Sequence, residues 1–303
     1  MRRCVILLLA ILGPVSLLAN SCGEDPTGVG AERTIHVDAH GTGDFPHIQA
    51  AVDNAADGDT IELADGYYSG EGNRDIDFHG KTITIRSRSG IPDSCILSGG
   101  GRQRRAFIFQ SGEGRDAIVD GLRVTGFSGR SLPLPMYQPP LRDPLVATSG
   151  GALLCRRGAS PTIKSCVFTS NYATRGGIVF CYEDASPRFQ NCTVCDNTSG
   201  AMAGLFEGWE ASLELTHTLV AFNNSAVVSQ GGTPLVAEIN CCDFFGNLSD
   251  WAGEIDSLLH VNGNTSKDPR FADLEHHDLS LLPESPCLPD SSECGLIGAL
   301  GME

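Results

Sequence analysis

The feature that most constrains the fold is an internal repeat of about 26 residues between Gly151 and Asn247. An Ala-Ser-Pro turn opens copies at Ala159 and Ala185, and degraded copies follow at Ala211 and near Ile239. Each copy alternates strand-length apolar segments with turn residues. One such unit cannot bury its apolar face alone, whereas stacked units bury a continuous core. The repeat therefore predicts a solenoid of stacked β-coils.

Equivalent residues of stacked coils form columns, because neighbouring strands lie ~4.8 Å apart. The columns predicted to point inward are Ile163, Phe189, Leu215 and Ile239; Phe168, Val194, Val220 and Phe244; and Cys166, Cys192, Thr218 and Cys242. A structural asparagine column is predicted from Asn171, Asn197, Asn223 and Asn247. Asparagine amides stacked at a corner hydrogen-bond to the neighbours above and below.

The segment before the repeat predicts a short helix over 46–56, between strands at 34–37 and 60–63. This opening, from Val37-Asp-Ala-His-Gly-Thr-Gly-Asp-Phe45 to Gly58-Asp-Thr-Ile-Glu-Leu63, resembles the start of pectin-lyase-like β-helix proteins. The tail from Lys267-Asp-Pro-Arg-Phe271 onward resembles the closing segment of bacterial parallel β-helix repeat proteins. The resemblance implies an all-β, right-handed parallel β-helix with a short N-terminal capping helix.

The chain divides into a leader, a tether and one predicted β-helix domain over 34–303. Residues 1–21 have the basic start and short apolar run of a signal peptide. Residues 22–33 are rich in Gly, Pro and acids and predict a flexible tether. Within the domain, 128–149 carries five prolines and predicts an inserted loop. Residues 267–303 are the predicted closing segment, expected to cover the last rung.

Cys22 directly follows the small residues of the predicted cleavage site. This arrangement resembles a bacterial lipoprotein signal, which implies lipidation of Cys22 and a membrane contact through that anchor alone. The alternative is ordinary secretion without lipidation. Both alternatives predict export, to the cell envelope or the extracellular space.

An exported chain permits disulfides, and twelve cysteines are present. Cys287 and Cys294 lie off the repeat and flank a short turn, so a local disulfide between them is predicted. The repeat cysteines stand in columns, where bridged pairs such as Cys155 with Cys181 and free, packed thiols are both compatible with the spacing.

Pectin methylesterases share the opening motif, but their catalytic motifs do not follow here. That family needs a pair of aspartates, two glutamine-bearing strands and an Arg-Pro-Trp segment. The nearest match is Asp243-Phe-Phe-Gly-Asn247, and the columns account for its Phe244 and Asn247 without catalysis. No catalytic residue is therefore predicted.

One turn of the solenoid carries the pattern of a ligand site: Tyr182, Glu183, Asp184, Trp209 and Glu210. A shift of about 26 residues places Glu210 over Asp184 and Trp209 over Glu183. Aromatic rings beside carboxylates suit sugar binding. The alternative is a solvated turn with a weak Arg157–Glu183 pair. Calcium is the one metal that these carboxylates would suit, and no other metal or cofactor is predicted.

The net charge of −16 opposes binding to nucleic acid. Three functional hypotheses remain. The leading one is an exported or surface-tethered, non-catalytic β-helix protein that binds carbohydrate or adheres to it, with polysaccharide as partner. The competing one is a polysaccharide lyase or glycoside hydrolase of the same fold, which needs carboxylates and a basic residue converging in one groove. The third is a purely structural envelope protein.

Overall fold

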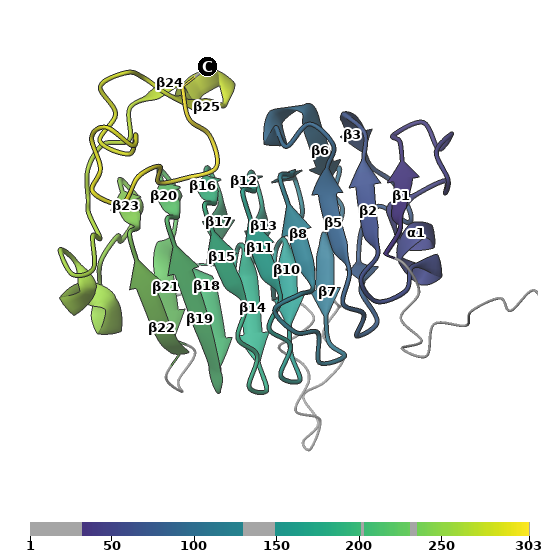
Figure 1. Cartoon of the computed structure of the whole chain (residues 1–303). Coiled ribbons are helices and arrows are strands. Elements are labelled where there is room, and N and C mark those ends of the chain that lie inside the picture. Colours follow the sequence, from purple (N-terminus) through teal and green to yellow (C-terminus); the bar gives the residue numbers. More distant parts are fainter. Residues whose placement is uncertain (1–31, 130–148, 201–202, 231–234, 303) are drawn as a thin grey trace, which may run out of the picture. The chain divides into compact units, whose positions relative to one another are not determined.

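The computed structural model describes residues 32–129, 149–200, 203–230 and 235–302. The predicted signal peptide, Cys22, most of the tether and residues 130–148 of the predicted loop lie outside these ranges. Within them, no helix is long and apolar enough to cross a membrane. The described chain is a parallel β-helix, as the repeat predicted: three parallel sheets run side by side along it (Figure 1).

Most turns of the chain contribute one strand to each sheet, so sheet neighbours are strands from successive turns. The eight-stranded sheet contains β1 (Thr34–Val37), β2 (Thr60–Leu63), β5 (Thr84–Ser87), β8 (Ile118–Asp120), β11 (Thr162–Lys164), β15 (Arg188–Gln190), β19 (Ala211–Thr216) and β22 (Leu235–Asn240). The six-stranded sheet contains β4 (Ile76–Asp77), β7 (Phe107–Phe109), β10 (Leu153–Cys155), β14 (Val179–Tyr182), β18 (Gly204–Trp209) and β21 (Ala226–Gln230).

The seven-stranded sheet closes the coil. It contains β3 (Gly66–Tyr68), β6 (Cys95–Ser98), β9 (Arg123–Thr125), β12 (Val167–Thr169), β16 (Thr193–Cys195), β20 (Leu219–Ala221) and β23 (Asp243–Phe245). Two small pairs complete the strands: parallel β13 (Tyr172–Ala173) with β17 (Thr198–Ser199), and antiparallel β24 (Phe271–Asp273) with β25 (Asp278–Leu281). The helices are α1 (Ile48–Asn54) and the 3-10 turns Pro92–Ser94, Gly253–Leu258 and Leu274–His276.

The predicted inward columns match the strand register. In the eight-stranded sheet Ile163 pairs with Phe189, Phe189 with Leu215, and Leu215 with Ile239. In the seven-stranded sheet Phe168, Val194, Val220 and Phe244 are stacked in the same way. All these side chains are buried, and burial of such large apolar groups stabilises each by roughly 1.5–3 kcal/mol.

The four column asparagines form a hydrogen-bonded ladder at one corner. Asn171 Nδ2 donates to Asn197 Oδ1 (3.1 Å), Asn197 Nδ2 to Asn223 Oδ1 (3.0 Å), and Asn223 Nδ2 to Asn247 Oδ1 (2.7 Å). Each amide also donates to a backbone carbonyl of the preceding rung. The residue before each asparagine has positive φ: Ser170, Asp196, Phe222 and Gly246. The ladder thus satisfies backbone groups that a left-handed corner residue leaves without strand partners.

The N-terminal end is closed by α1. His47 Nδ1 accepts a hydrogen bond from Ala50 N (3.1 Å), and the helix buries Ile48, Ala51 and Val52 against the first rung. The free edge of β1 is covered too: Asp44 accepts from His36 N through Oδ2 (2.7 Å) and donates its own N–H to His36 O (2.7 Å). These bonds block the pairing of another strand at His36.

The last rung is closed by residues 251–258, and not by the tail as the sequence predicted. The Trp251 ring stacks on Phe244 with 4.3 Å between centroids, and Ile255 and Leu258 pack on the main core. The tail over 267–303 instead lies on the outer face of the seven-stranded sheet (yellow in Figure 1). There it forms a second apolar cluster, whose buried members are Val167, Cys195, Leu219, Ala221, Phe271, Leu279, Leu281, Cys287, Leu288 and Ile297.

The predicted disulfide is wrong: Cys294 is bonded to Cys241, with Cα atoms 5.6 Å apart. Cys241 has positive φ at the turn between β22 and β23, whereas Cys242 takes the buried column position. Cys287 is a free, buried thiol whose Sγ lies 3.8 Å from Asp243 Oδ2. The bond therefore ties the tail to the β-helix. Cys155 and Cys181 are in register but free, as packed thiols.

Candidate functional site: the outer face of the six-stranded sheet

A row of polar and aromatic side chains crosses the outer face of the six-stranded sheet. It consists of Asp77, Gln110, Arg156, Tyr182 and Trp209, and we name it the outer row. Gln110 and Arg156 directly follow Phe109 and Cys155, the last paired residues of β7 and β10. Cys155 is also paired with Cys181 on β14, so Tyr182 lies at the same position on the next strand. Side chains alternate across a strand, so inward positions go to the core and these positions face outward.

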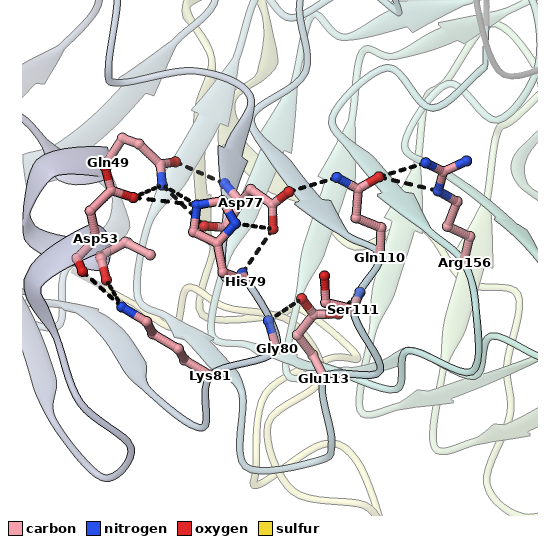
Figure 2. A network of polar contacts seen from close by, with 11 residues as sticks. Gln49, Asp53, Asp77, His79, Gly80, Lys81, Gln110, Ser111, Glu113 and Arg156 are labelled. Carbon is pink, nitrogen blue, oxygen red and sulfur yellow. Dashed lines mark hydrogen bonds and ion pairs between the residues drawn. The ribbon is translucent and has the colours of Figure 1, made fainter.

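Hydrogen bonds join the first four members of the outer row, and Figure 2 shows those among Asp77, Gln110 and Arg156. Gln110 Nε2 donates to Asp77 Oδ2 (2.6 Å). Arg156 donates to Gln110 Oε1 from Nε (3.2 Å) and Nη2 (2.7 Å), and to the Tyr182 hydroxyl from Nη1 (2.7 Å). A carboxylate and a guanidinium are thus linked through an amide, which holds all these side chains in one orientation.

The outer row continues into α1 at its N-terminal end. Gln49 accepts from Asp77 N through Oε1 (2.9 Å) and donates to Asp77 O (3.1 Å). Its side-chain amide therefore pairs with the backbone of β4 as a neighbouring strand would. Asp53 accepts from Gln49 Nε2 (2.7 Å), and His79 lies 3.3 Å from Asp53 and donates its backbone N–H to Asp77 Oδ1 (2.8 Å) (Figure 2). Asp77 is therefore a fixed anchor with both carboxylate oxygens engaged.

Trp209 lies next to Tyr182, and not over Glu183 as the sequence predicted. The register between β14 and β18 pairs Tyr182 with Trp209, an offset of 27, while β15 and β19 return to 26. The difference is absorbed at the turn, where Glu183 and Asp184 both have positive φ but only Glu210 separates β18 from β19. The two aromatic residues therefore occupy neighbouring rungs, ~4.8 Å apart.

A buried ion pair supports Trp209 from beside the outer row. The Glu207 side chain is 1% exposed, and its carboxylate lies 3.4 Å from Arg175 Nε and accepts from Gly176 N (3.2 Å). The Arg175 guanidinium stands over the Trp209 ring at 4.9 Å, and the Phe180 edge approaches the same ring. Burial raises the pKa of Glu207, against the opposing effect of Arg175.

The acidic residues of the predicted turn lie apart from this face. Glu183, Asp184 and Glu210 are exposed, and their turns are stacked through backbone bonds such as Asp184 N to Glu210 O (2.8 Å). The Arg157–Glu183 contact is long (3.9 Å) and exposed, so it stabilises little. Across the described ranges, no three His, Cys, Asp or Glu side chains are placed to hold a metal ion.

The esterase-like segment is structural. Phe244 and Asn247 take their column positions, and Asp243 is fully buried beneath the tail. Asp243 Oδ1 accepts from Thr265 Oγ1 (2.6 Å) and Lys267 N (2.8 Å). Burial raises the pKa of Asp243.

Sequence reasoning found Tyr182 and Trp209 but missed Asp77, Gln110 and Arg156. Asp77 and Gln110 come from turns before the clear repeat, and Arg156 was not included in the predicted site although the period of 26 aligns it with Tyr182. The available signal was the position after each inward residue: Phe109, Cys155 and Cys181 are followed by Gln110, Arg156 and Tyr182.

No family model matches this sequence, and no curated protein matches it. Among solved structures, the pectin methylesterase from carrot is similar at 13% identity and a TM-score of 0.30, covering 79% of this chain and 90% of that one. The pectin methylesterase from Aspergillus niger, in a penultimately deglycosylated form, is similar at 10% identity and a TM-score of 0.26, covering 78% and 90%. These values carry no information about the activity of this chain.

Proposed function

We propose that this chain is an exported, non-catalytic β-helix protein that binds polysaccharide along the outer row. The observation that carries the proposal is the placement of Tyr182 and Trp209 on neighbouring rungs, in line with the Arg156 guanidinium and the Gln110 amide. Aromatic rings offer an apolar surface to the C–H groups of a sugar. Amide and guanidinium groups at the ring edge supply hydrogen bonds to its hydroxyls.

The geometry of the outer row favours binding over cleavage. Glycosidic hydrolysis uses two carboxyl groups that flank the scissile bond. The outer row contains Asp77 alone, and Gln110 and His79 N occupy its oxygens. Glu207, the neighbouring carboxyl, is buried against Arg175 and Gly176. Neither group is free to exchange a proton with a ligand on the surface.

One observation favours the competing function, a polysaccharide lyase or hydrolase. A carboxylate, an amide and a guanidinium stand in one hydrogen-bonded line, which would polarise a carbonyl or stabilise developing charge. In that case turnover would depend on Asp77. The test below separates the two functions.

The experiment is a panel of neutral and acidic polysaccharides, scored for retention in affinity electrophoresis and for release of reducing ends or of unsaturated products. We expect retention without release, and loss of retention in Trp209→Ala and Tyr182→Ala. Tyr172→Ala is the matched control, because Tyr172 is an exposed tyrosine on β13, away from the outer row. Product release that disappears in Asp77→Asn would establish the enzyme instead.

We further propose that residues 1–21 are removed on export and that Cys22 then carries a lipid anchor. The small residues before Cys22 and the tether over 22–33 support this proposal. Mass spectrometry of the mature N-terminus tests it: a lipid-sized mass addition on Cys22 is expected, and an unmodified Cys22 would contradict the anchor.

A further inference from the structure

The two edge strands of the eight-stranded sheet, β1 and β22, differ in how the backbone groups on their free sides are hydrogen-bonded. At the first end, Asp44 covers both the N–H and the C=O of His36 on β1. At the last end, β22 pairs with β19 on one side only, as the final strand of the sheet. A free strand edge is a template for another strand unless it is covered.

The backbone of β22 alternates between its two sides. Asn240 O accepts from His217 N (3.1 Å) on the β19 side. Ile239 O and Cys241 N face the other way, where Asn264 Nδ2 (2.8 Å) and Asn262 O (2.9 Å) bind them. By this alternation Ala237 also directs its N–H and C=O toward the free side, and within the described ranges no backbone or side-chain group binds them there. The cover ends before Ala237.

A groove runs along this uncovered part of β22. Its volume is about 330 Å³, and it is lined by Ala237, Glu238, Ile239, Asn240, Leu258 and Asn262. Leu258 and Ile239 give it an apolar floor at the end of the core. The groove therefore offers strand-pairing groups and an apolar contact side by side, which is the combination that an added β-strand uses.

Above the groove, a column of charged side chains ends at the last rung on an acidic residue. Arg188, Glu214 and Glu238 are in register on successive strands. Arg188 Nε (2.8 Å) and Arg115 Nη2 (3.5 Å) both lie against the Glu214 carboxylate. Glu238 is exposed; it interacts with Arg115 through space, and no direct ion pair joins it to a described cation. A basic residue on the next strand would occupy the position that completes this column.

We infer that the free edge of β22 binds an extended peptide of a partner protein by strand addition, with a basic residue of that peptide against Glu238. A second copy of this chain is a poor occupant. Its β1 edge is blocked at His36 by Asp44, and a β22–β22 contact would bring two Glu238 side chains together in a chain of net charge −16.

The test uses the full chain and a synthetic eight-residue peptide, acetylated and amidated, that alternates valine with lysine and threonine. Controls are the same peptide with glutamate in place of lysine, and one with alternate N-methylated amides. Binding is measured by fluorescence anisotropy. We expect the lysine peptide to bind, and both control peptides to bind at least about tenfold more weakly.

Two variants of the protein probe the edge and the charge separately. Ala237→Pro removes only an edge-facing N–H and should weaken the lysine peptide about tenfold. Glu238→Lys should reverse the preference toward the glutamate peptide. Val236→Thr is the matched control on the same strand, outside the groove, and should leave binding within about twofold.

Equal binding of the lysine and glutamate peptides, or no binding of either, would overturn the inference. Sedimentation velocity of the chain alone adds a further arm: a dimer that Ala237→Pro dissociates would make the second copy the occupant and overturn it as well. If Ala237→Pro unfolds, as judged by thermal melting, the reversal in Glu238→Lys decides alone.

Discussion

The outer faces of the seven-stranded and six-stranded sheets differ although the same coils build both. On the seven-stranded sheet, outward positions such as Val167, Leu219 and Ala221 are apolar, and the tail over 267–303 buries them. On the six-stranded sheet, outward positions carry the outer row, from Asp77 to Trp209, together with the buried Leu154 and Phe180. Inward columns are alike on both sheets.

The two faces therefore carry different groups on the same scaffold. Inward columns repeat because every rung must bury the same core. Outward positions differ between the sheets: one face holds the chain's own tail, while the other carries the partly exposed side chains of the outer row.

The largest expected effect is on the covered face. Leu219 is 1% exposed beneath the tail, so Leu219→Ala should lower the free energy of unfolding by about 2–5 kcal/mol. Ile108, outward on the six-stranded sheet and only partly buried, is the matched position, and Ile108→Ala should cost about 1 kcal/mol or less. Urea unfolding measures both. Equal losses would remove the distinction between the faces.

The disulfide should have the next largest effect, because it anchors the tail to the covered face. Cys294→Ser releases the bond to Cys241 across 53 residues and should cost about 2–4 kcal/mol. Limited proteolysis should then cut within 267–303 first. Peptide mapping under non-reducing conditions checks the pairing, and a cross-linked peptide joining Cys287 to Cys294 would contradict the structure.

Asn197 tests the scaffold that both faces share. Asn197→Ala removes a buried amide that donates to Asn223 Oδ1 and accepts from Asn171, and should cost about 1–3 kcal/mol. Asn224 is an exposed asparagine directly after Asn223 and has no positive φ, so Asn224→Ala should change stability by about 0.5 kcal/mol or less. Thermal and urea unfolding report both values, and a neutral Asn197→Ala would contradict the ladder's role.

The smallest effect is a pH dependence from Glu207, beside the outer row. Burial raises its pKa in the folded state, so the folded protein keeps this proton where the unfolded chain has lost it. The contribution of Glu207 to the free energy of unfolding is fully present below the pKa of a glutamate in the unfolded chain, about 4.3. It is lost as the pH rises through the pKa of Glu207 in the folded protein. Glu207→Gln should therefore show a flatter pH profile than the parent between about pH 4 and 7. Parallel profiles in urea unfolding would contradict a raised pKa.

Sequence predicted the parts of the fold that repeat. The spacing of Phe168, Val194, Val220 and Phe244 fixed a column because every rung meets the same packing requirement. The asparagine spacing was informative for the same reason. By contrast, the offset of 27 at Trp209 depends on a turn that uses one residue where the previous turn uses two, and a fixed period conceals such an exchange.

The predictions of the disulfide and of the position of the tail were wrong for a different reason. Pairing Cys287 with Cys294 assumed a local bond, but the neighbouring pair Cys241-Cys242 already held the signal. Only one of two consecutive residues can point inward, so the other was available at the surface. Likewise, the outward apolar residues Val167 and Leu219 required a cover, which the tail supplies.

The central claim is that the six-stranded face, and not the covered seven-stranded face, receives the polysaccharide. Hydrogen–deuterium exchange with and without a polysaccharide retained in the panel tests it most directly. We predict new protection in β14 and β18, around Tyr182 and Trp209, and unchanged exchange in β16 and β20. Protection confined to β16, β20 or the tail, with none in β14 and β18, would contradict the claim.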